Sequence, residues 1–275
     1  MLKYFRESIK RKIARRITKE YPPKVEQIEV EGYGKIDFAN WTNPLVPHCS
    51  LTAEMIGFFK QFINEGDLVI DIGANIGDTT VPMALCAGAT GLTLAFDPNP
   101  LVFKILEKNA SLNPGMQNIE PLRFAISKEE ESFYFVSSEA SFGNGGISVT
   151  KESPHGKFVY PEKILGINLH HLLESKYSDR VLRLSFIKID TEGYDKEIIK
   201  SIHDLIIKCK PVIVAESFGD ASDSDKKELF DVIHKCGYEI FYFEDFNINA
   251  PVIKLNENTD MLRWSYTVNI YAKPL

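Results

Sequence analysis

Short apolar runs alternate with amphipathic segments along most of the chain. The runs are rich in Val, Ile, Leu and Phe, which favours buried strands, and they lie at residues 68–72, 93–96, 119–126, 184–190, 211–216, 238–243 and 266–272. Helical spacing of apolar residues predicts helices at residues 52–63, 78–87, 101–109, 168–175, 195–208 and 224–235. Such alternation is typical of a doubly wound α/β fold with a mainly parallel, seven-stranded sheet. The seventh strand follows the sixth without a long helix, so we expect it to be antiparallel.

Two neighbouring stretches do not fit this alternation. Residues 133–136 alternate weakly between apolar and polar, which predicts a hairpin arm. Residues 141–148 contain three glycines, too many for a regular element. We therefore expect a mobile loop near a cofactor or substrate, with a plain surface loop as the alternative.

The first twenty residues have the pattern of a basic amphipathic helix. Apolar residues recur every three or four positions, with Lys and Arg around them, at Leu2, Phe5, Ile9, Ile13 and Ile17. Such a helix can lie on an anionic membrane surface. Its apolar face can equally pack on the rest of the chain or on a second subunit, and the pattern does not choose between these partners. We divide the chain into this extension (1–24), a lead-in segment with a covering helix (25–66) and an α/β domain (67–275).

The first predicted strand runs into a helix through a turn that holds Gly73 and Gly77. Glycine lets the backbone come close to a ligand, and the first helical turn offers free N–H groups. The turn lacks the G-x-G-x-x-G of dinucleotide sites, and Asp71 and Asp78 lie on its two sides. These carboxylates would repel a pyrophosphate but suit an ammonium and a sulfonium group. The turn thus indicates S-adenosylmethionine, and a turn that binds no ligand is the alternative.

The ends of the second and third strands extend this site. Asp97 ends the second strand, where a carboxylate can accept both ribose hydroxyls of a nucleotide. It could instead only begin the turn before Pro98. The third strand ends at Ala125 and Ile126, which we expect beside the adenine.

Three carboxylates follow the fourth and fifth strands, at the expected position of the sulfonium methyl group of S-adenosylmethionine. They are Asp190, Glu192 and Glu216. We expect Glu192 to act as the base or to anchor the acceptor, with Asp190 nearer the cofactor. Together they could also bind Mg²⁺, or Asp190 and Glu192 could only cap the following turn and helix. Two loop histidines, His48 and His155, are further candidates for the base.

Charge and cysteine content narrow the class of protein. Asp and Glu number 38 against 32 Lys and Arg, a net charge of −6, and residues 1–24 alone carry +7. The acidic remainder argues against a nucleic-acid substrate. Four scattered cysteines fit a reducing cytoplasm and argue against structural zinc. No apolar run is long enough to span a bilayer, so we expect a cytoplasmic protein, with peripheral contact at the inner membrane surface as an option.

Three motifs together resemble those of the FkbM-type methyltransferases, a family of class I S-adenosylmethionine-dependent enzymes. They are Asp-Ile-Gly-Ala-Asn-Ile-Gly at 71–77, Ala-Phe-Asp-Pro-Asn-Pro at 95–100 and Ile-Lys-Ile-Asp-Thr-Glu-Gly at 187–193. The likeness covers about residues 51–218, and the ordered set is more specific than any single motif. It implies the Rossmann-like class I methyltransferase fold and transfer of a methyl group to an oxygen of a sugar, polyketide or other natural product.

The resemblance also assigns positions to the cofactor. The residues expected to bind it are Asp71, Gly73, Ala74, Asn75, Gly77, Asp78, Asp97, Pro98, Asn99, Ala125, Ile126 and Asp190. Asp97 departs from the family, which often has Glu there, so its reach is shorter. Residues 167–171 lack an acidic residue that is common in the family, so no catalytic role is carried onto them.

Two other functions compete with methyl transfer. A non-catalytic domain of this fold could bind a partner or membrane through the N-terminal helix. The presence of both Asp71 and Asp97 argues against it, because a domain without a cofactor would be free to lose them. An oxidoreductase is disfavoured by the missing G-x-G-x-x-G. For the methyl acceptor the sequence leaves several classes open: a small molecule, a free glycan or a lipid-linked glycan.

Overall fold

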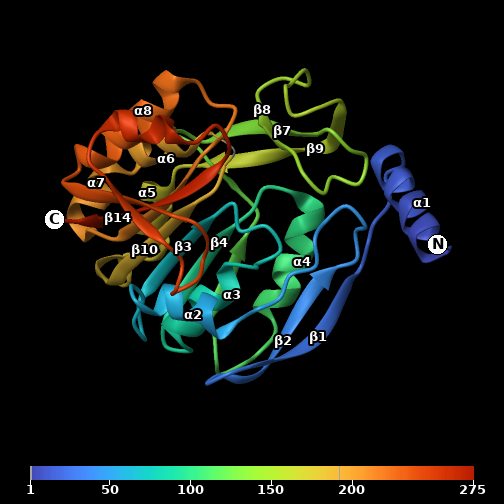
Figure 1. The fold of residues 1–275 in the computed structure, drawn as a ribbon, viewed down its shortest axis with the longest axis horizontal. Coiled ribbons are helices and arrows are strands. Elements are labelled where there is room, and N and C mark those ends of the chain that lie inside the picture. The colour runs from blue at the N-terminus through green and yellow to red at the C-terminus, as the bar shows by residue number, and fades with distance from the viewer. Residues whose placement is uncertain (1, 192) are drawn as a thin grey trace.

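An eight-stranded sheet forms the centre of the computed structural model, which describes residues 2–191 and 193–275 (Figure 1). Its strand order is β13-β12-β14-β11-β10-β3-β4-β5. In chain order these strands are β3 (Leu68–Ile72), β4 (Leu92–Phe96), β5 (Ile119–Leu122), β10 (Leu184–Ile189), β11 (Val212–Ser217), β12 (Tyr238–Phe243), β13 (Val252–Leu255) and β14 (Val268–Pro274). Each of the seven predicted strands has a counterpart in this sheet, although the third is shorter than predicted. The eighth, β13, is a short edge strand of four residues with mostly exposed side chains, and the sequence analysis did not identify it.

The directions of the strands show at which edge of the sheet a ligand is expected to bind. β5, β4, β3, β10 and β11 are parallel, and β14 runs antiparallel to both β11 and β12, as predicted. The chain leaves β3 towards β4 on one side and later returns to β10 on the other. Ligands bind at such a switch point, beyond the carboxyl ends of the strands.

Helices cover both faces of the sheet, because successive strand residues point to opposite sides. On one face lie α2 (Ala53–Lys60), α3 (Thr80–Ala87) and α4 (Pro100–Ala110), where Val69 and Phe186 point into the core. On the other lie α5 (Leu169–Lys176), α6 (Asp195–Ser201), α7 (His203–Cys209) and α8 (Asp223–His234), packed on Ile70 and Ile187. The predicted single helix at 195–208 is divided, because Ile202 leaves the helical conformation. Short 3₁₀ turns stand at Val181–Arg183 and Asn258–Arg263.

A second sheet, inserted between β5 and α5, forms an arm over the carboxyl edge of the main sheet (Figure 1). Its order is β6 (Ala125–Ile126), β9 (Phe158–Ile167), β7 (Glu131–Ser137) and β8 (Gly146–Ser148). The arm predicted at 133–136 is thus present and larger than expected. The predicted third strand, 119–126, is wrong as one element. The N–H of Phe124 donates to the carbonyl of Leu122, which turns the chain and moves Ala125 and Ile126 into the second sheet.

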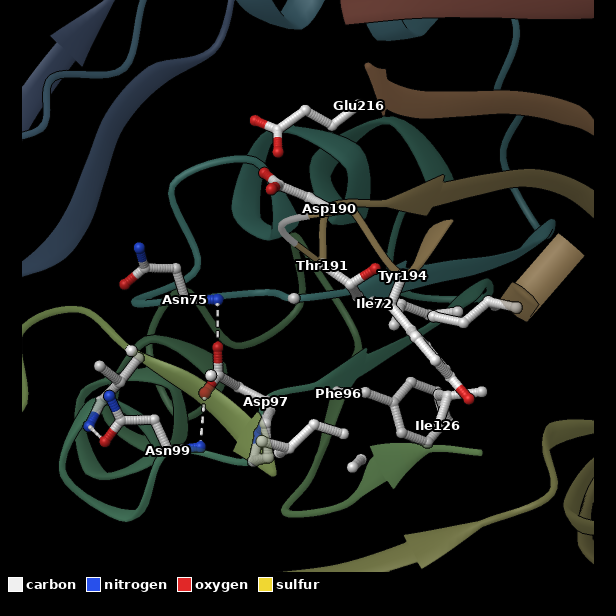
Figure 2. A pocket seen from close by; sticks show the side chains of 18 of the residues that line it. Ile72, Asn75, Phe96, Asp97, Asn99, Ile126, Asp190, Thr191, Tyr194 and Glu216 are labelled. Atoms are coloured by element: carbon white, nitrogen blue, oxygen red, sulfur yellow. Dashed lines mark hydrogen bonds between the residues drawn. The ribbon is translucent and has the colours of Figure 1, made fainter. Parts of the chain in front are cut away.

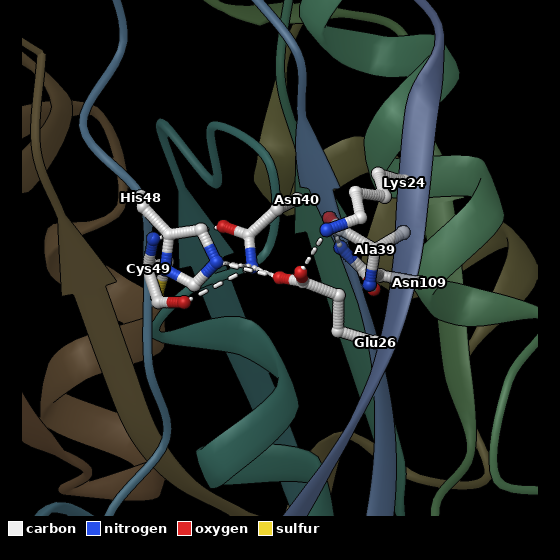
Figure 3. A network of polar contacts seen from close by, with 7 residues as sticks. All are labelled: Lys24, Glu26, Ala39, Asn40, His48, Cys49 and Asn109. Atoms are coloured by element: carbon white, nitrogen blue, oxygen red, sulfur yellow. Dashed lines mark hydrogen bonds and ion pairs between the residues drawn. The ribbon is translucent and has the colours of Figure 1, made fainter.

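In the lead-in segment, β1 (Pro23–Val30) and β2 (Gly34–Trp41) form a full antiparallel hairpin. Asn109 on α4 accepts from and donates to the backbone of Ala39, which fastens the hairpin to the domain. A polar network on the other side of the hairpin holds the segment before α2 (Figure 3). In it, Asn40 bonds both backbone groups of Cys49, and His48 Nε2 lies 2.5 Å from Glu26 Oε2. His48 therefore belongs to this network.

The predicted N-terminal helix is present as α1 (Leu2–Arg16) and lies beside the arm (Figure 1). Ala14 is fully buried on the side that meets the body. The N–H of Ala140 donates to the carbonyl of Arg15 (3.2 Å), and Arg11 Nε donates to the carbonyl of Pro44 (3.2 Å). Among the described residues, no helix is both long enough and apolar enough to cross a membrane.

Candidate active site

A cavity of about 830 Å³ opens at the carboxyl ends of β3, β4, β10 and β11, under the arm (Figure 2). The expected site residues that line it are Gly73, Asn75, Asp78, Asp97, Pro98, Asn99, Ala125, Ile126, Asp190 and Glu216. The sheet therefore brings together residues that are up to about 140 positions apart in the chain. Glu192, the expected base, lies outside the described residues.

The turn after β3 needs glycine for a steric reason. Gly73 has φ +77°, and a Cβ built on it would lie 1.9 Å from the carbonyl oxygen of Asp190. The N–H groups of Gly73 and Ala74 both donate to the carbonyl of Phe96 (2.9 Å each). The turn is thus packed between the ends of β4 and β10, where only a residue without a side chain fits.

Asp97 is held by the backbone of both turns that flank the cavity (Figure 2). One carboxylate oxygen accepts the N–H of Asn75 and the other accepts the N–H of Asn99, each at 2.8 Å. Burial raises the pKa of Asp97 to about 7, although these two N–H groups oppose the shift. The side chain is therefore fixed in orientation, faces the cavity and changes charge near neutral pH.

A buried lysine ties two of the carboxylates together, and the sequence analysis did not single it out. Lys188 and Asp71 are register partners on the adjacent parallel strands β10 and β3, and Asp190 follows Lys188 by two residues on the same face. Lys188 Nζ accordingly lies 3.4 Å from Asp71 Oδ1 and 3.1 Å from Asp190 Oδ2. Burial alone would lower the pKa of Lys188, but Asp190, Asp71 and Asp78 raise it, so the lysine is charged. The sequence did contain a signal: Lys188 is a charged residue within an apolar strand, and a buried charge needs a partner of opposite charge.

Asp71 does not line the cavity. Its side chain is fully buried, and one carboxylate oxygen accepts hydroxyl hydrogen bonds from Thr79 (3.1 Å) and Thr80 (2.7 Å). Asp71 therefore holds the start of α3 against the end of β3. Of the other expected cofactor residues, Ala74 is buried and Gly77, at φ +96°, lets the turn pass Leu106. Neither residue is part of the cavity lining.

The loop after β10 is positioned by Asp195, a second residue that the sequence analysis missed. Its carboxylate accepts the N–H and hydroxyl of Thr191 and, through its other oxygen, the N–H of Glu216. Burial raises the pKa of Asp195 to about 6, against the effect of these hydrogen bonds. The bonds join the ends of β10 and β11, so Asp190 and Glu216 point into the same part of the cavity (Figure 2).

The glycine-rich stretch predicted near the cofactor or substrate lines the cavity through residues 143–148. Residues 146–148 form β8, so the prediction that this stretch holds no regular element is wrong there. The hydroxyl of Ser137 donates to Asn144 Oδ1, and the amide of Asn99 donates to the carbonyl of Phe142, which attaches the loop to the start of α4. His155 also lines the cavity, where burial lowers its pKa. His48 does not line it. Across the two described stretches of the chain, no group of three or more acidic, His or Cys side chains could hold a metal ion, and Mg²⁺ stays a prediction.

Comparison with known proteins decides the family. A model of the methyltransferase FkbM domain matches residues 71–240, more than half of the chain. The chain belongs to the FkbM methyltransferase family. This membership confirms the resemblance carried by the three motifs, and with it the class of S-adenosylmethionine-dependent methyltransferases.

One relative of this FkbM methyltransferase is the hexuronic acid methyltransferase AglP of Haloferax volcanii. The two are 27% identical over 209 residues, which cover 76% of this chain and 74% of the relative. Among solved structures, a SAM-dependent O-methyltransferase from Thermotoga maritima is 10% identical with a TM-score of 0.45, covering 91% of this chain and 77% of that one. TYW2 of M. jannaschii in complex with AdoMet is 17% identical with a TM-score of 0.42, covering 93% and 86%. At these TM-scores neither structure bears on the function.

Proposed function

We propose that this methyltransferase binds S-adenosylmethionine in the cavity and methylates a hydroxyl oxygen of a neutral sugar or related natural product. The observation that supports it best is that one cavity has a candidate cofactor-binding carboxylate at one end and candidate acceptor-binding carboxylates at the other. Asp97 is fixed by backbone N–H groups at one end, and Asp190 and Glu216 point inward at the other (Figure 2).

The residues present fit the cofactor. A volume of about 830 Å³ is within the usual range for small-molecule sites. The carboxylate of Asp97 can accept both ribose hydroxyls, and Ala125 and Ile126 offer an apolar surface to the adenine. The turn at 73–78 would hold the amino-acid end. When bound, the cofactor supplies an electrophilic methyl group on a cationic sulfur, which the acidic lining favours.

The chain's own residues must hold the acceptor in line and remove its proton. Glu192 is the base that we propose, since in the sequence it directly follows Thr191, whose N–H and hydroxyl donate to the carboxylate of Asp195. Glu216 and Asp190 would accept hydrogen bonds from the acceptor's hydroxyls. The buried Lys188, whose Nζ lies 3.1 Å from Asp190 Oδ2, orients the Asp190 carboxylate.

The charge of the cavity favours a neutral acceptor. The carboxyl side chains among its described lining residues are Asp78, Asp97, Glu131, Asp190, Glu216 and Asp245. Lys188 is the one Lys or Arg of that lining, and it is already paired with Asp71 and Asp190. A hexuronic acid would add a negative charge without a cation to receive it, which costs free energy in a confined site. A neutral sugar would donate its hydroxyls to these carboxylates instead.

A second candidate is methylation of a hexuronic acid, the activity named for the relative. The two candidates separate in an assay of labelled methyl transfer to neutral glycosides and to matched hexuronates, with and without Mg²⁺. We expect transfer to the neutral set. Transfer to hexuronates alone would overturn the neutral acceptor, and failure to bind the cofactor at all would overturn the proposal as a whole.

We expect cofactor affinity to fall as the pH decreases below about 7. Ribose hydroxyls bond best to the charged form of Asp97, whose pKa is raised to about 7, so binding below that pH must release a proton. The loss should approach about tenfold per pH unit. Calorimetric titration of S-adenosylmethionine and S-adenosylhomocysteine across neutral pH measures it.

Asp97→Asn is the control for this titration, because Asp78 and Asp195 also have raised pKa values. We expect the variant to bind about tenfold or more weaker, since hydrogen bonds to a charged group are lost. Its affinity should no longer depend on pH in this range. An unchanged pH profile in Asp97→Asn would remove Asp97 from the cofactor site.

Glu192→Gln should lower kcat by about 100-fold or more while the cofactor dissociation constant stays the same, because a general base contributes to the transition state alone. Glu216→Gln should raise the KM for the acceptor more than it lowers kcat. Both are measured with the best acceptor of the glycoside panel. If neither variant changes kcat, the proton is removed elsewhere, and His155 becomes the next residue to replace.

A further inference from the structure

The apolar side of α1 points away from the protein. The exposed fractions of its side chains are 65% for Phe5, 52% for Ile9 and 41% for Ile13, and that of Ile17, just after the helix, is 57%. The side that meets the body carries the small, fully buried Ala14 instead. At 100° per residue the stripe of Phe5, Ile9 and Ile13 is nearly opposite to Ala14 and Arg11. The sequence left open that this stripe packs on the rest of the chain. In the structure it does not, because these side chains are exposed.

Positive charge surrounds this stripe. Residues 2–16 contain seven Lys or Arg and one Glu, a net charge of +6, in a chain whose overall charge is −6. Lys12 and Arg16 are exposed and flank the stripe on the same side of the helix. Two copies of α1 packed stripe against stripe would bring these charges together without compensation. Anionic lipid headgroups neutralise them while the apolar side chains enter the headgroup boundary.

We propose that α1 docks this methyltransferase on the surface of an anionic lipid bilayer, with Phe5, Ile9, Ile13 and Ile17 inserted. The helix lies flat on the bilayer, and its Lys and Arg side chains reach the headgroups. This inference does not depend on the acceptor or on methyl transfer.

The helix that carries the docking surface is bonded to the segment that leads into the cavity lining. α1 is bonded through the carbonyl of Arg15 to Ala140, in the loop whose residues 143–148 line the cavity. Two residues further on, the carbonyl of Phe142 accepts from Asn99, which lies beside Asp97. A bilayer docked on α1 would therefore be joined through the helix to the segment that lines the cavity, which suits acceptors held at the membrane.

Sedimentation of the full chain with vesicles tests the proposal. Phosphatidylcholine vesicles with phosphatidylserine should bind the protein, and vesicles of phosphatidylcholine alone should bind it weakly. Added salt should reduce the binding, since surface charge interactions are screened. Ile9→Glu/Ile13→Glu should lower the partition coefficient by about tenfold or more, and Lys12→Gln/Arg16→Gln by a similar factor on anionic vesicles only.

Matched control variants distinguish an effect of the α1 stripe from a general effect of the changed charge on vesicle binding. Leu182→Glu/Ile207→Glu places the same charges on exposed apolar positions elsewhere, and Lys128→Gln/Lys208→Gln removes the same charge from exposed lysines elsewhere. Both should bind vesicles as the parent protein does, and all variants should keep its Tm and its affinity for S-adenosylmethionine. Equal loss in the control variants, or no vesicle binding by the parent, would overturn the proposal. A dimer that Ile9→Glu/Ile13→Glu dissociates, without vesicle binding, would show that the stripe is a subunit interface instead.

Discussion

Replacement of Lys188 by Met should destabilise the protein by about 3–5 kcal/mol, because it leaves the carboxylate of Asp71 buried without a counter-charge. Methionine keeps most of the side-chain volume, so the loss reports charge and not a cavity. The free energy of unfolding from urea denaturation measures it. Cofactor binding should weaken as well, since Asp71 holds Thr79 and Thr80 at the start of α3 and Asp190 lines the cavity.

Two variants test this interpretation of Lys188. Lys200→Met removes a lysine that also pairs with two carboxylates, Glu197 and Glu228, but in an exposed position, and should cost about 1 kcal/mol or less. Asp71→Asn in the Lys188→Met background should recover part of the stability, because it removes the unpaired charge. Additive losses in the double variant would show that the two residues act independently.

Gly73→Ala should abolish measurable cofactor binding and cost about 3 kcal/mol or more of stability. The new Cβ would lie 1.9 Å from the carbonyl oxygen of Asp190, and φ is +77°. Either the turn or the end of β10 must move, and both carry residues that line the cavity. Urea denaturation and calorimetric titration with S-adenosylmethionine measure the two effects.

Gly34→Ala is the matched control, since Gly34, the first residue of β2, has φ +76° and nothing lies within 4 Å of its added Cβ. It should show the cost of backbone strain alone, about 1–2 kcal/mol, with cofactor affinity unchanged. Equal losses in the two alanine variants would mean that the close approach to Asp190 has no consequence for the site.

Local pattern was sufficient for most strands and helices of the central domain, for the mainly parallel direction of the sheet and for much of the site. The apolar runs located seven strands of the central sheet, and the three motifs located residues that do line one cavity, among them Gly73, Asp97 and Asp190. These features could be predicted because a buried strand, a glycine turn and a carboxylate at a strand end are each set by neighbouring residues.

The tertiary structure alone decided which carboxylates meet the cavity and which hold it together. Asp71 and Asp97 look alike in sequence, but the register of β3 against β10 places Asp71 beside Lys188, inside the sheet. The bonds from Asp195 to Thr191 and Glu216 depend on two strands that lie side by side only in the folded protein. The outward direction of the α1 stripe likewise follows from the contacts of Ala14 and Arg15 with the body. Register and docking are set by long-range contacts, which no local pattern encodes.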